Sequence, residues 1–409
     1  MRQTTALATV LSLLFTAPLA AAQENPVAAT APVDGETPAP AYDWAVLHAG
    51  VRPRLATFAG VGTLALAQGR VHHFYGLASF ATVRQDAGVY VGGAELALGQ
   101  ANAERFYGGL QLGLSKNLVG TFVGVGQVSL AHDDAESFGG LLQLAPYDRA
   151  GDFTGMLQLG GWDHVERDFD GALQLGVAHV DADTFRGALQ LSLAQAATRD
   201  FGGALQLAPY AHTDDFAGLL QLGVYARDDE RFTGGAQLGV ANWDDGRFTG
   251  ALQAGVFDYV RGDFTGLAQV GALAGVDHAM WAPLQIGAFV AYANDFHGLA
   301  QIGPGVVAEK VHGAQIGIVD VSSTSHEGVQ IGLCDYSGDL RGAQLGLVNV
   351  ADKVHGVQIG LFNDATSLRG LQIGLVNHAE DGSLVPWSTL VNMGFGPEGS
   401  TAPMAASNE

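Results

Sequence analysis

The chain has 409 residues, and its 41 acidic and 19 basic residues give a formal net charge of −22. This charge argues against a nucleic-acid partner and against electrostatic binding to anionic lipid. Glycine is abundant at 58 residues while proline is ordinary at 13, which excludes a collagen-like chain. Cys334 is the only cysteine, which excludes a disulfide framework and a cysteine metal site, and we expect it to be a small buried filler.

The first residues have the three-part pattern of a secretory signal. Arg2 is followed by an apolar run over residues 6–15 and by three alanines at 20–22, which predicts a signal peptide over residues 1–22. The apolar run is too short for a membrane-spanning helix. Residues 23–42, rich in Pro, Ala and Thr, predict a flexible linker. The chain is therefore expected to be exported, and any entry into a membrane would need strands.

A tandem repeat fills most of the remaining chain. A glutamine recurs every 15 or 16 residues up to Gln301 and every 14 or 15 residues after it. An aromatic residue lies five positions before most of the earlier glutamines, as Phe169 does before Gln174. Three degenerate units, centred on Thr63, Ser79 and Glu95, precede the regular ones. The repeat-defining residues, to which we assign a structural role, are Gln111, Gln127, Gln143, Gln158, Gln174, Gln190, Gln206, Gln221, Gln237, Gln253, Gln269, Gln285, Gln301, Gln315, Gln330, Gln344, Gln358 and Gln372.

Within a unit, apolar and small or polar residues alternate, which predicts a β-strand of about ten residues. Phe169, Leu173 and Leu175 would share an apolar face that must be hidden, and Gln174 would lie on the other. One polar stretch per unit suggests one strand and one reversal of the chain per unit. The domain would then consist of about twenty neighbouring antiparallel strands. Substituting Leu175 and Leu191 by Asp is then expected to prevent folding or insertion.

Two all-β architectures can hide such a face. A closed antiparallel up-and-down barrel removes the exposed edges, and its strands would match the apolar band of an outer membrane, so it is the main prediction. The alternative is a β-solenoid with the apolar face stacked inward. Uniformly short linkers count against a porin, whereas a solenoid needs two turns per coil and each unit offers one obvious polar turn.

The last units are shorter and more regular, as in VHGVQIGLFN and LRGLQIGLVN. Residues 384–395, with Pro386 and Trp387, break the pattern and predict a terminating strand or cap. The expected organisation is therefore a repetitive β domain over residues 43–395 and a disordered tail over residues 396–409.

The glutamine column offers two interpretations. A ladder of mutually bonded amides would fix the register, and Gln174→Ala is then expected to be nearly neutral if the ladder is redundant. Alternatively, the amides would line a pore or a ligand groove.

Histidines occur beside acids in segments expected to be turns, and solvated turns are the simpler interpretation than cation sites, because no calcium-loop spacing is present. These groups are His132 with Asp133 and Asp134, His164 with Glu166, His179 with Asp181 and Asp183, and His212 with Asp214 and Asp215. No nucleophile elbow, zinc-protease motif, phosphate loop or CxxC motif occurs. Because the acids are expected in turns, no buried carboxylate pair is predicted. We therefore expect no enzyme, no catalytic residue, no cofactor and no metal site.

The tandem units GVQIGLFNDATSLRGLQIGLVNHAEDGS, followed by VPWSTLVNMGF, resemble a family of bacterial surface-repeat proteins named from leptospiral members. That family is marked by tandem GxQxGLxN units near a C-terminal strand rich in Pro and aromatic residues. The resemblance covers residues 311–395 and implies an envelope or surface location, with no activity or functional residue to transfer.

The sequence thus predicts a non-enzymatic, exported repeat protein of the bacterial outer membrane or cell surface, with the periplasm as an alternative. It would be an outer-membrane barrel or pore in contact with lipid, or alternatively a soluble or surface-attached β-solenoid with a structural or adhesive role. The sequence specifies no protein or ligand partner.

Overall fold

The computed structural model describes residues 43–395, so the predicted signal peptide, linker and tail lie outside the described residues. The described residues form strands joined by short bends, with no helix among them. The chain divides into two compact units: unit 1 ends at Tyr210, and unit 2 begins at Ala211.

Unit 1 is made of successive strands connected in chain order. They are β1 (Asp43–Gly50), β2 (Arg54–Ala65), β3 (Gln68–Ala81), β4 (Arg84–Ala97), β5 (Gln100–Gly113), β6 (Lys116–Val123), β7 (Gly126–Ser129), β8 (His132–Gly139), β9 (Leu142–Thr154), β10 (Leu157–Asp170), β11 (Leu173–Arg186), β12 (Leu189–Ser192) and β13 (Gln195–Leu207).

Unit 2 continues the same pattern from β14, which starts at the last residue of unit 1. Its strands are β14 (Tyr210–Leu222), β15 (Tyr225–Leu238), β16 (Ala241–Asp244), β17 (Arg247–Ala254), β18 (Phe257–Val260), β19 (Phe264–Thr265), β20 (Ala268–Trp281), β21 (Leu284–Ile302), β22 (Gly305–Ile316), β23 (Val319–Ile331), β24 (Cys334–Leu345), β25 (Val348–Ile359), β26 (Phe362–Asp381) and β27 (Trp387–Phe395).

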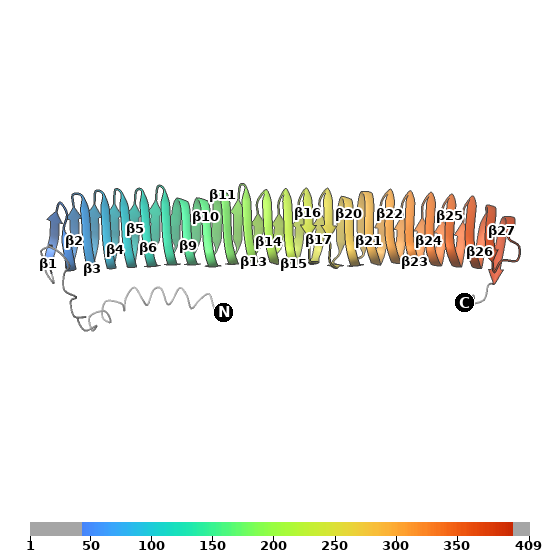
Figure 1. The fold of residues 1–409 in the computed structure, drawn as a ribbon, viewed down its shortest axis with the longest axis horizontal. Helices are drawn as coiled ribbons and strands as arrows, with labels where there is room; N and C mark the ends of the chain where they lie inside the picture. The colour runs from blue at the N-terminus through green and yellow to red at the C-terminus, as the bar shows by residue number, and fades with distance from the viewer. Residues whose placement is uncertain (1–42, 396–409) are drawn as a thin grey trace, which may run out of the picture. The chain divides into compact units, whose positions relative to one another are not determined.

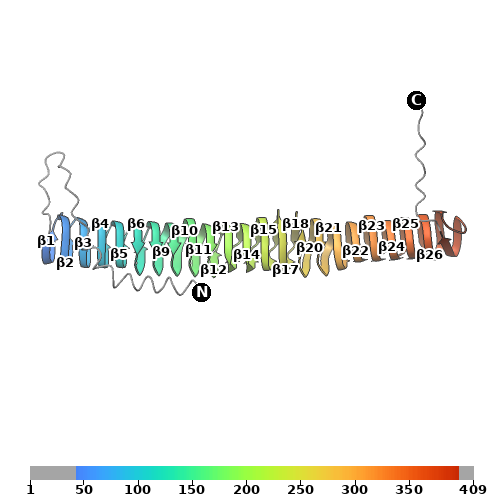
Figure 2. The same cartoon turned by 90° about the horizontal axis from the view of Figure 1, so that it is seen from below.

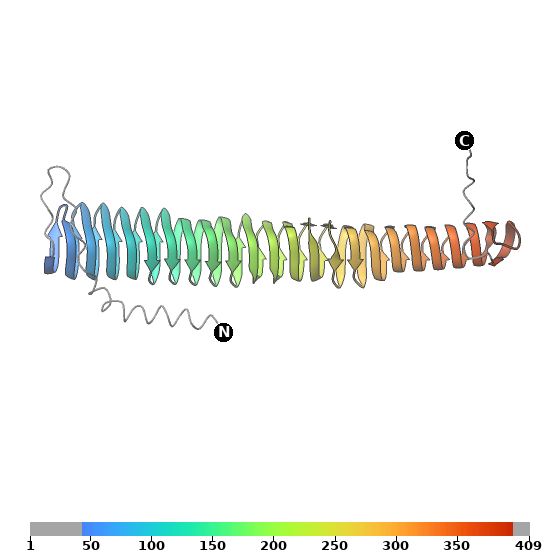
Figure 3. The same ribbon diagram turned by 60° about the horizontal axis from the view of Figure 1, so that its bottom comes forward.

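Within each unit, a strand pairs in parallel with the strand one repeat away. On β10 and β11, Gln158 lies opposite Gln174 and Phe169 opposite Phe185, and unit 2 repeats this with Gln344 opposite Gln358 on β24 and β25. Strands of successive repeats therefore stack side by side in each unit (Figure 1). Figure 2 and Figure 3 show the same stacking from two other directions.

The predicted antiparallel barrel is wrong, and the β-solenoid alternative is confirmed. A parallel ladder with an offset of one repeat requires the chain to return to the same side once per repeat. Each repeat is therefore a complete coil rather than one strand and one reversal. Bends were missed because they carry small and apolar residues instead of a polar turn, as at Gly171 and Ala172 between β10 and β11 and at Leu193 and Ala194 between β12 and β13.

The predicted faces were also wrong. Phe169 and Gln174, five residues apart, would point to opposite sides of a straight strand. A bend at Gly171 and Ala172 lies between them, so that both side chains point inward and are fully buried. Leu173 and Leu175, which flank Gln174, consequently point outward and are partly exposed.

Stacked aromatic rings fill one part of the interior. In unit 1 the rings of Phe106 and Phe122 lie 5.0 Å apart at an interplanar angle of 1°, and in unit 2 those of Phe232 and Phe248 lie 4.7 Å apart. This distance is the spacing of neighbouring strands, about 4.8 Å, because equivalent residues in successive coils occupy the same place. The repeat of Phe along the sequence thus becomes a column of rings.

The last coils of unit 2 have fewer residues than the earlier ones, and glycines at equivalent positions in these coils permit the closer approach of the backbone. Gly342 has φ +147°, a conformation that L side chains rarely adopt, and a Cβ added there would lie 1.9 Å from the carbonyl oxygen of Gly328. The final strand, β27, differs from the others because it pairs antiparallel to β26. It is the terminating strand expected from the sequence.

Candidate functional site

The glutamine column forms a one-directional chain of amide hydrogen bonds in the interior of unit 1. The Nε2 atom of Gln127 donates to Oε1 of Gln111 at 3.1 Å, and Gln174 donates to Gln158 at 3.0 Å. The chain runs without a break from Gln206 to Gln111, which donates to the buried carboxyl group of Glu95 at 2.9 Å. Burial raises the pKa of Glu95 to about 8, although the bond from Gln111 acts to lower it.

Many of the repeat-defining glutamines in both units also donate a hydrogen bond to a backbone oxygen six or seven residues later in the same coil. Gln174 Nε2 donates to the backbone oxygen of Asp181 at 3.0 Å, and Gln372 does the same to His378 at 2.9 Å. Each such glutamine therefore joins neighbouring coils and also holds two sides of its own coil together.

Unit 2 contains an equivalent chain from Gln372 to Gln221. At its C-terminal end, Asn392 on the antiparallel strand β27 donates to Oε1 of Gln372 at 3.3 Å. Every predicted repeat-defining glutamine is fully buried. These amides bond to one another inside packed coils, so they do not line an open pore or groove.

A column of buried carboxyl groups runs beside the glutamines in unit 1. Asp133, Asp148 and Asp163 lie opposite one another on β8, β9 and β10, and all three are fully buried. Asn117 donates to Asp133 at 2.7 Å, and the backbone N–H of Ala145 donates to Asp148 at 3.0 Å. Burial raises the pKa of Asp133 to about 7 and that of Asp163 to about 8. Burial, together with the charges of its two neighbours, raises the pKa of Asp148 to about 10.

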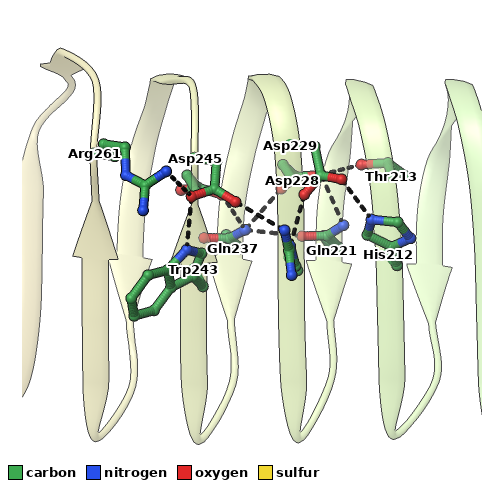
Figure 4. Close-up of polar contacts among 11 residues, drawn as sticks. His212, Thr213, Gln221, Asp228, Asp229, Gln237, Trp243, Asp245 and Arg261 are labelled. Atoms are coloured by element: carbon green, nitrogen blue, oxygen red, sulfur yellow. Dashed lines mark hydrogen bonds and ion pairs between the residues drawn. The ribbon is translucent and has the colours of Figure 1, made fainter.

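Unit 2 holds buried acids as well. Asp228 accepts hydrogen bonds from Gln221 at 3.1 Å and from Gln237 at 2.7 Å, as Figure 4 shows. Burial raises the pKa of Asp228, and burial together with the charge of Asp228 raises that of Asp244. Further along, Asp320 lies opposite Asp335, and burial raises the pKa of each to about 7.

The expectation that acids lie only in turns, with no buried pair, was therefore wrong. A signal was present in the sequence: Asp or Asn recurs five or six residues after many glutamines, in phase with the repeat. The small residue two positions after glutamine makes room for it. A Cβ added at Gly160 would lie 2.3 Å from Oδ1 of Asp163, and one at Gly317 would lie 2.4 Å from Oδ1 of Asp320.

The histidine and acid groups lie on strands rather than in turns. They belong to β8 (His132, Asp133, Asp134), β10 (His164, Glu166), β11 (His179, Asp181, Asp183) and β14 (His212, Asp214, Asp215). Asp133 points inward and is fully buried, while His132 and Asp134 beside it remain partly exposed. His164 contacts Asp181 on the next coil through Nδ1 at 2.7 Å, and this hydrogen bond raises the pKa of His164.

His212, Asp214 and Asp229 in unit 2 could place one ligand atom each within 4.8 Å of one another. Asp229, however, already accepts a hydrogen bond from Nε of Arg227 at 2.6 Å, and Nε2 of His212 lies 3.2 Å from its other oxygen (Figure 4). Although partial burial acts to raise it, these two partners lower the pKa of Asp229. The carboxylate is thus neutralised by a guanidinium group, which disfavours a cation at the same position.

An open groove of about 790 Å³ lies on the outside of unit 1. Its lining mixes charges of both signs, and several of them pair with one another: Arg84 with Asp86 at 2.6 Å, and Arg149 with Asp134 and Glu166. The groove is therefore not lined by one sign of charge alone, as a site that attracts an anionic or a cationic ligand would be.

On the outer surface of each unit, uncharged and charged residues lie in separate regions. The seven-residue segment from two positions before to four positions after each repeat-defining glutamine contains no Asp, Glu, Lys, Arg or His in any repeat. We call the outward side chains of these segments the uncharged wall. In unit 2 it includes Leu333, Leu347, Leu361 and Leu375, which are 48%, 48%, 42% and 57% exposed. Cys334 also lies there and is exposed, so its prediction as a buried filler was wrong.

The charged residues occupy the rest of the outer surface, where many form ion pairs between neighbouring coils. Arg167 pairs with Asp152 at 2.6 Å in unit 1. In unit 2, Arg227 pairs with Asp245 at 2.9 Å and Arg261 pairs with the same Asp245 at 3.1 Å. We call this part of the surface the charged wall.

Residues 43–395 contain no helix that is long and apolar enough to cross a membrane. Comparison of the chain with protein-family models, with curated proteins and with solved structures finds no match.

Proposed function

We propose that this chain is a non-enzymatic structural module of a bacterial cell envelope. It is a β-solenoid that attaches through its uncharged wall and presents its charged wall to water. The separation of the two walls is the observation that carries this proposal. Isolated exposed apolar residues are normal on any protein, but a continuous uncharged surface repeated coil after coil marks a surface that contacts a partner.

The interior chemistry supports a structural role over a catalytic one. A catalytic acid or base must reach its substrate. The carboxyl groups of Asp133, Asp148 and Asp163 have raised pKa values but are fully buried within stacked coils. Together with the glutamine chain, they link the coils to one another instead of facing a ligand.

The envelope location rests on two features of the sequence. Residues 1–22 have the pattern of a secretory signal. The tandem GxQxGLxN units within residues 311–395 resemble those of bacterial surface-repeat proteins. With a net charge of −22, attachment to an anionic surface would have to be apolar rather than electrostatic.

The test is fractionation of expressing cells, comparing the wild-type chain with the variant Ile331→Lys/Ile359→Lys. Both side chains lie on the uncharged wall of unit 2 and are 43% and 41% exposed. We expect the processed wild-type chain in the envelope or periplasmic fraction, and a weaker association with its partner surface for the variant. Retention of the unprocessed chain in the cytoplasm would contradict the proposed location.

A further inference from the structure

We propose that the uncharged wall of unit 2 binds the uncharged wall of a second copy of this chain, forming a face-to-face homodimer. This inference rests on the proposed function, because it names the partner of the attaching wall. The wall consists of strands in register, so its outward side chains form rows at the spacing of the coils. A second copy carries the same rows at the same spacing.

The area of the wall is sufficient for a stable interface. Four or five residues across at about 3.3 Å each, since the segments end in bends, and eleven coils at about 4.8 Å each give an area of about 700–900 Å². The largest apolar patch on a typical monomer is about 300–600 Å². A standard stable interface buries about 800 Å² on each partner. The area of the wall therefore exceeds the largest apolar patch of a typical monomer and is close to the area that a standard stable interface buries.

The composition of the wall suits packing of one sheet on another. Around Gln344 and Gln358, the outward residues are Leu345, Leu347, Ile359 and Leu361, each between 37% and 48% exposed. Leu345 and Ile359 are the last residues of β24 and β25, and Leu347 and Leu361 lie in the bends that follow. Branched aliphatic side chains on two facing sheets interdigitate at a separation of about 10 Å, as they do in a β-sandwich. Because the interface would relate two identical surfaces, a two-fold axis allows each row to contact its equivalent.

Charge also favours a second copy. The wall itself contains no charged residue, so two walls can meet without burying an unpaired charge. The exposed acids and bases of unit 2 lie on the charged wall, where Arg227 pairs with Asp229 and with Asp245. Repulsion between two copies of net charge −22 then acts mainly at a distance, where salt screens it.

A lipid surface fits the same wall less well. Proteins that lie on membranes place Trp at the interface and Lys or Arg around the apolar surface, where these residues contact headgroups. The eleven uncharged segments of unit 2 contain no Trp, and the net charge of the chain, −22, disfavours the anionic headgroups that Lys and Arg would contact. The observations therefore favour a protein partner with the same apolar rows.

The experiment is to measure the molar mass of the purified chain in the absence of detergent, by sedimentation or light scattering at micromolar concentration. The wall variant is Ile331→Lys/Ile359→Lys, and its matched control is Ser323→Lys/Thr366→Lys. The control adds the same two charges at exposed positions outside the uncharged wall. We expect twice the chain mass for wild type and control, and a single chain mass for the wall variant, with the same circular dichroism for all three.

Cys334 provides a second measurement, because this cysteine lies on the wall itself. We expect a thiol reagent to label it at least tenfold more slowly in the wild-type chain than in the wall variant. A wild-type monomer, or a wall variant that stays dimeric, would overturn the proposal. A wild-type dimer whose Cys334 is labelled as fast as that of the wall variant would also overturn it, since another surface would then form the dimer.

A monomer that floats with zwitterionic lipid vesicles would identify lipid as the occupant and reject the second copy. In that case the proposed envelope function would stand. A dimer in a chain that stays unprocessed in the cytoplasm would give the opposite result, with the dimer retained and the envelope location rejected.

Discussion

Asp148 and Asp163 lie opposite each other on β9 and β10, with both carboxyl groups buried inside unit 1. Three successive repeats, which contribute Asp133, Asp148 and Asp163, bring an acid to the same interior position, so the column holds groups that cannot all carry a charge. The consequence is a dependence of stability on pH that the overall charge of the chain does not predict.

The chain should be less stable at pH 8 than at pH 5. The pKa of each of these carboxyl groups is raised by folding, from the ordinary value of 3.8 to about 7 for Asp133 and about 8 for Asp163. A folded state that holds protons more tightly than the unfolded state loses stability as pH rises. The favourable contribution is complete below about pH 4 and is lost as pH rises through about 7 to 8.

Asp148→Asn should reduce this dependence. Asn117 already occupies the same column, so an amide fits there. We expect a rise of the melting temperature of at least about 5 °C at pH 8, and a smaller rise at pH 5. The control is Asp170→Asn, whose carboxylate points outward and pairs with Arg186. Equal pH dependence in wild type and Asp148→Asn, measured by thermal unfolding, would show that the column does not titrate as described.

Gln174→Ala should destabilise the fold, in contrast to the near-neutral effect expected from the sequence. The side chain donates to Gln158 and to the backbone oxygen of Asp181, and it accepts from Gln190. Its removal leaves buried polar groups without partners and opens a cavity, at a cost of about 2–4 kcal/mol. Denaturant unfolding gives the comparison, with Leu175→Ala on the same strand as the outward control. A loss no greater than that of the control would indicate that the ladder is redundant after all.

Leu175→Asp should be tolerated, which also reverses the expectation from the sequence. Leu175 points outward and is partly exposed, so the carboxylate stays in contact with water and the loss should not exceed about 1–2 kcal/mol. Val180→Asp, at a fully buried position on the same strand, should unfold unit 1 or cost more than about 4 kcal/mol. Circular dichroism and thermal unfolding distinguish the two variants, and similar losses in both would contradict the orientation of this strand.

Gly342→Ala should destabilise the short coils by about 3 kcal/mol or more. The added Cβ would meet the carbonyl oxygen of Gly328 at 1.9 Å, and φ at this position is +147°. Gly305→Ala is the matched control, because the nearest atom to its added Cβ lies at 3.4 Å and its φ is not in the left-handed region. The melting temperatures of the two variants should differ clearly, and equal values would mean that the coils can shift to accommodate a methyl group.

The sequence by itself determined the length of the repeat, the all-β class of the fold, and which residues occupy equivalent positions in successive repeats. Residues one repeat apart, such as Phe169 and Phe185, share an environment in any regular repeat, so the marker residues could be aligned without knowing the fold. The regular recurrence of Gln also indicated that an amide ladder was possible. The sequence did not contain what distinguishes a barrel from a solenoid.

Only the tertiary structure decided the direction of pairing and which residues point inward. Both depend on bends such as Gly171–Ala172 and Leu193–Ala194, which are made of small and apolar residues and have no distinctive composition. A single bend between Phe169 and Gln174 changes the alternation, so that an apparently polar face becomes the interior and Leu173 and Leu175 face outward. Hydropathy favoured burying leucine, but three-way hydrogen bonding stabilises buried Gln174. The exposed leucines then form the wall on which the proposed partner binds.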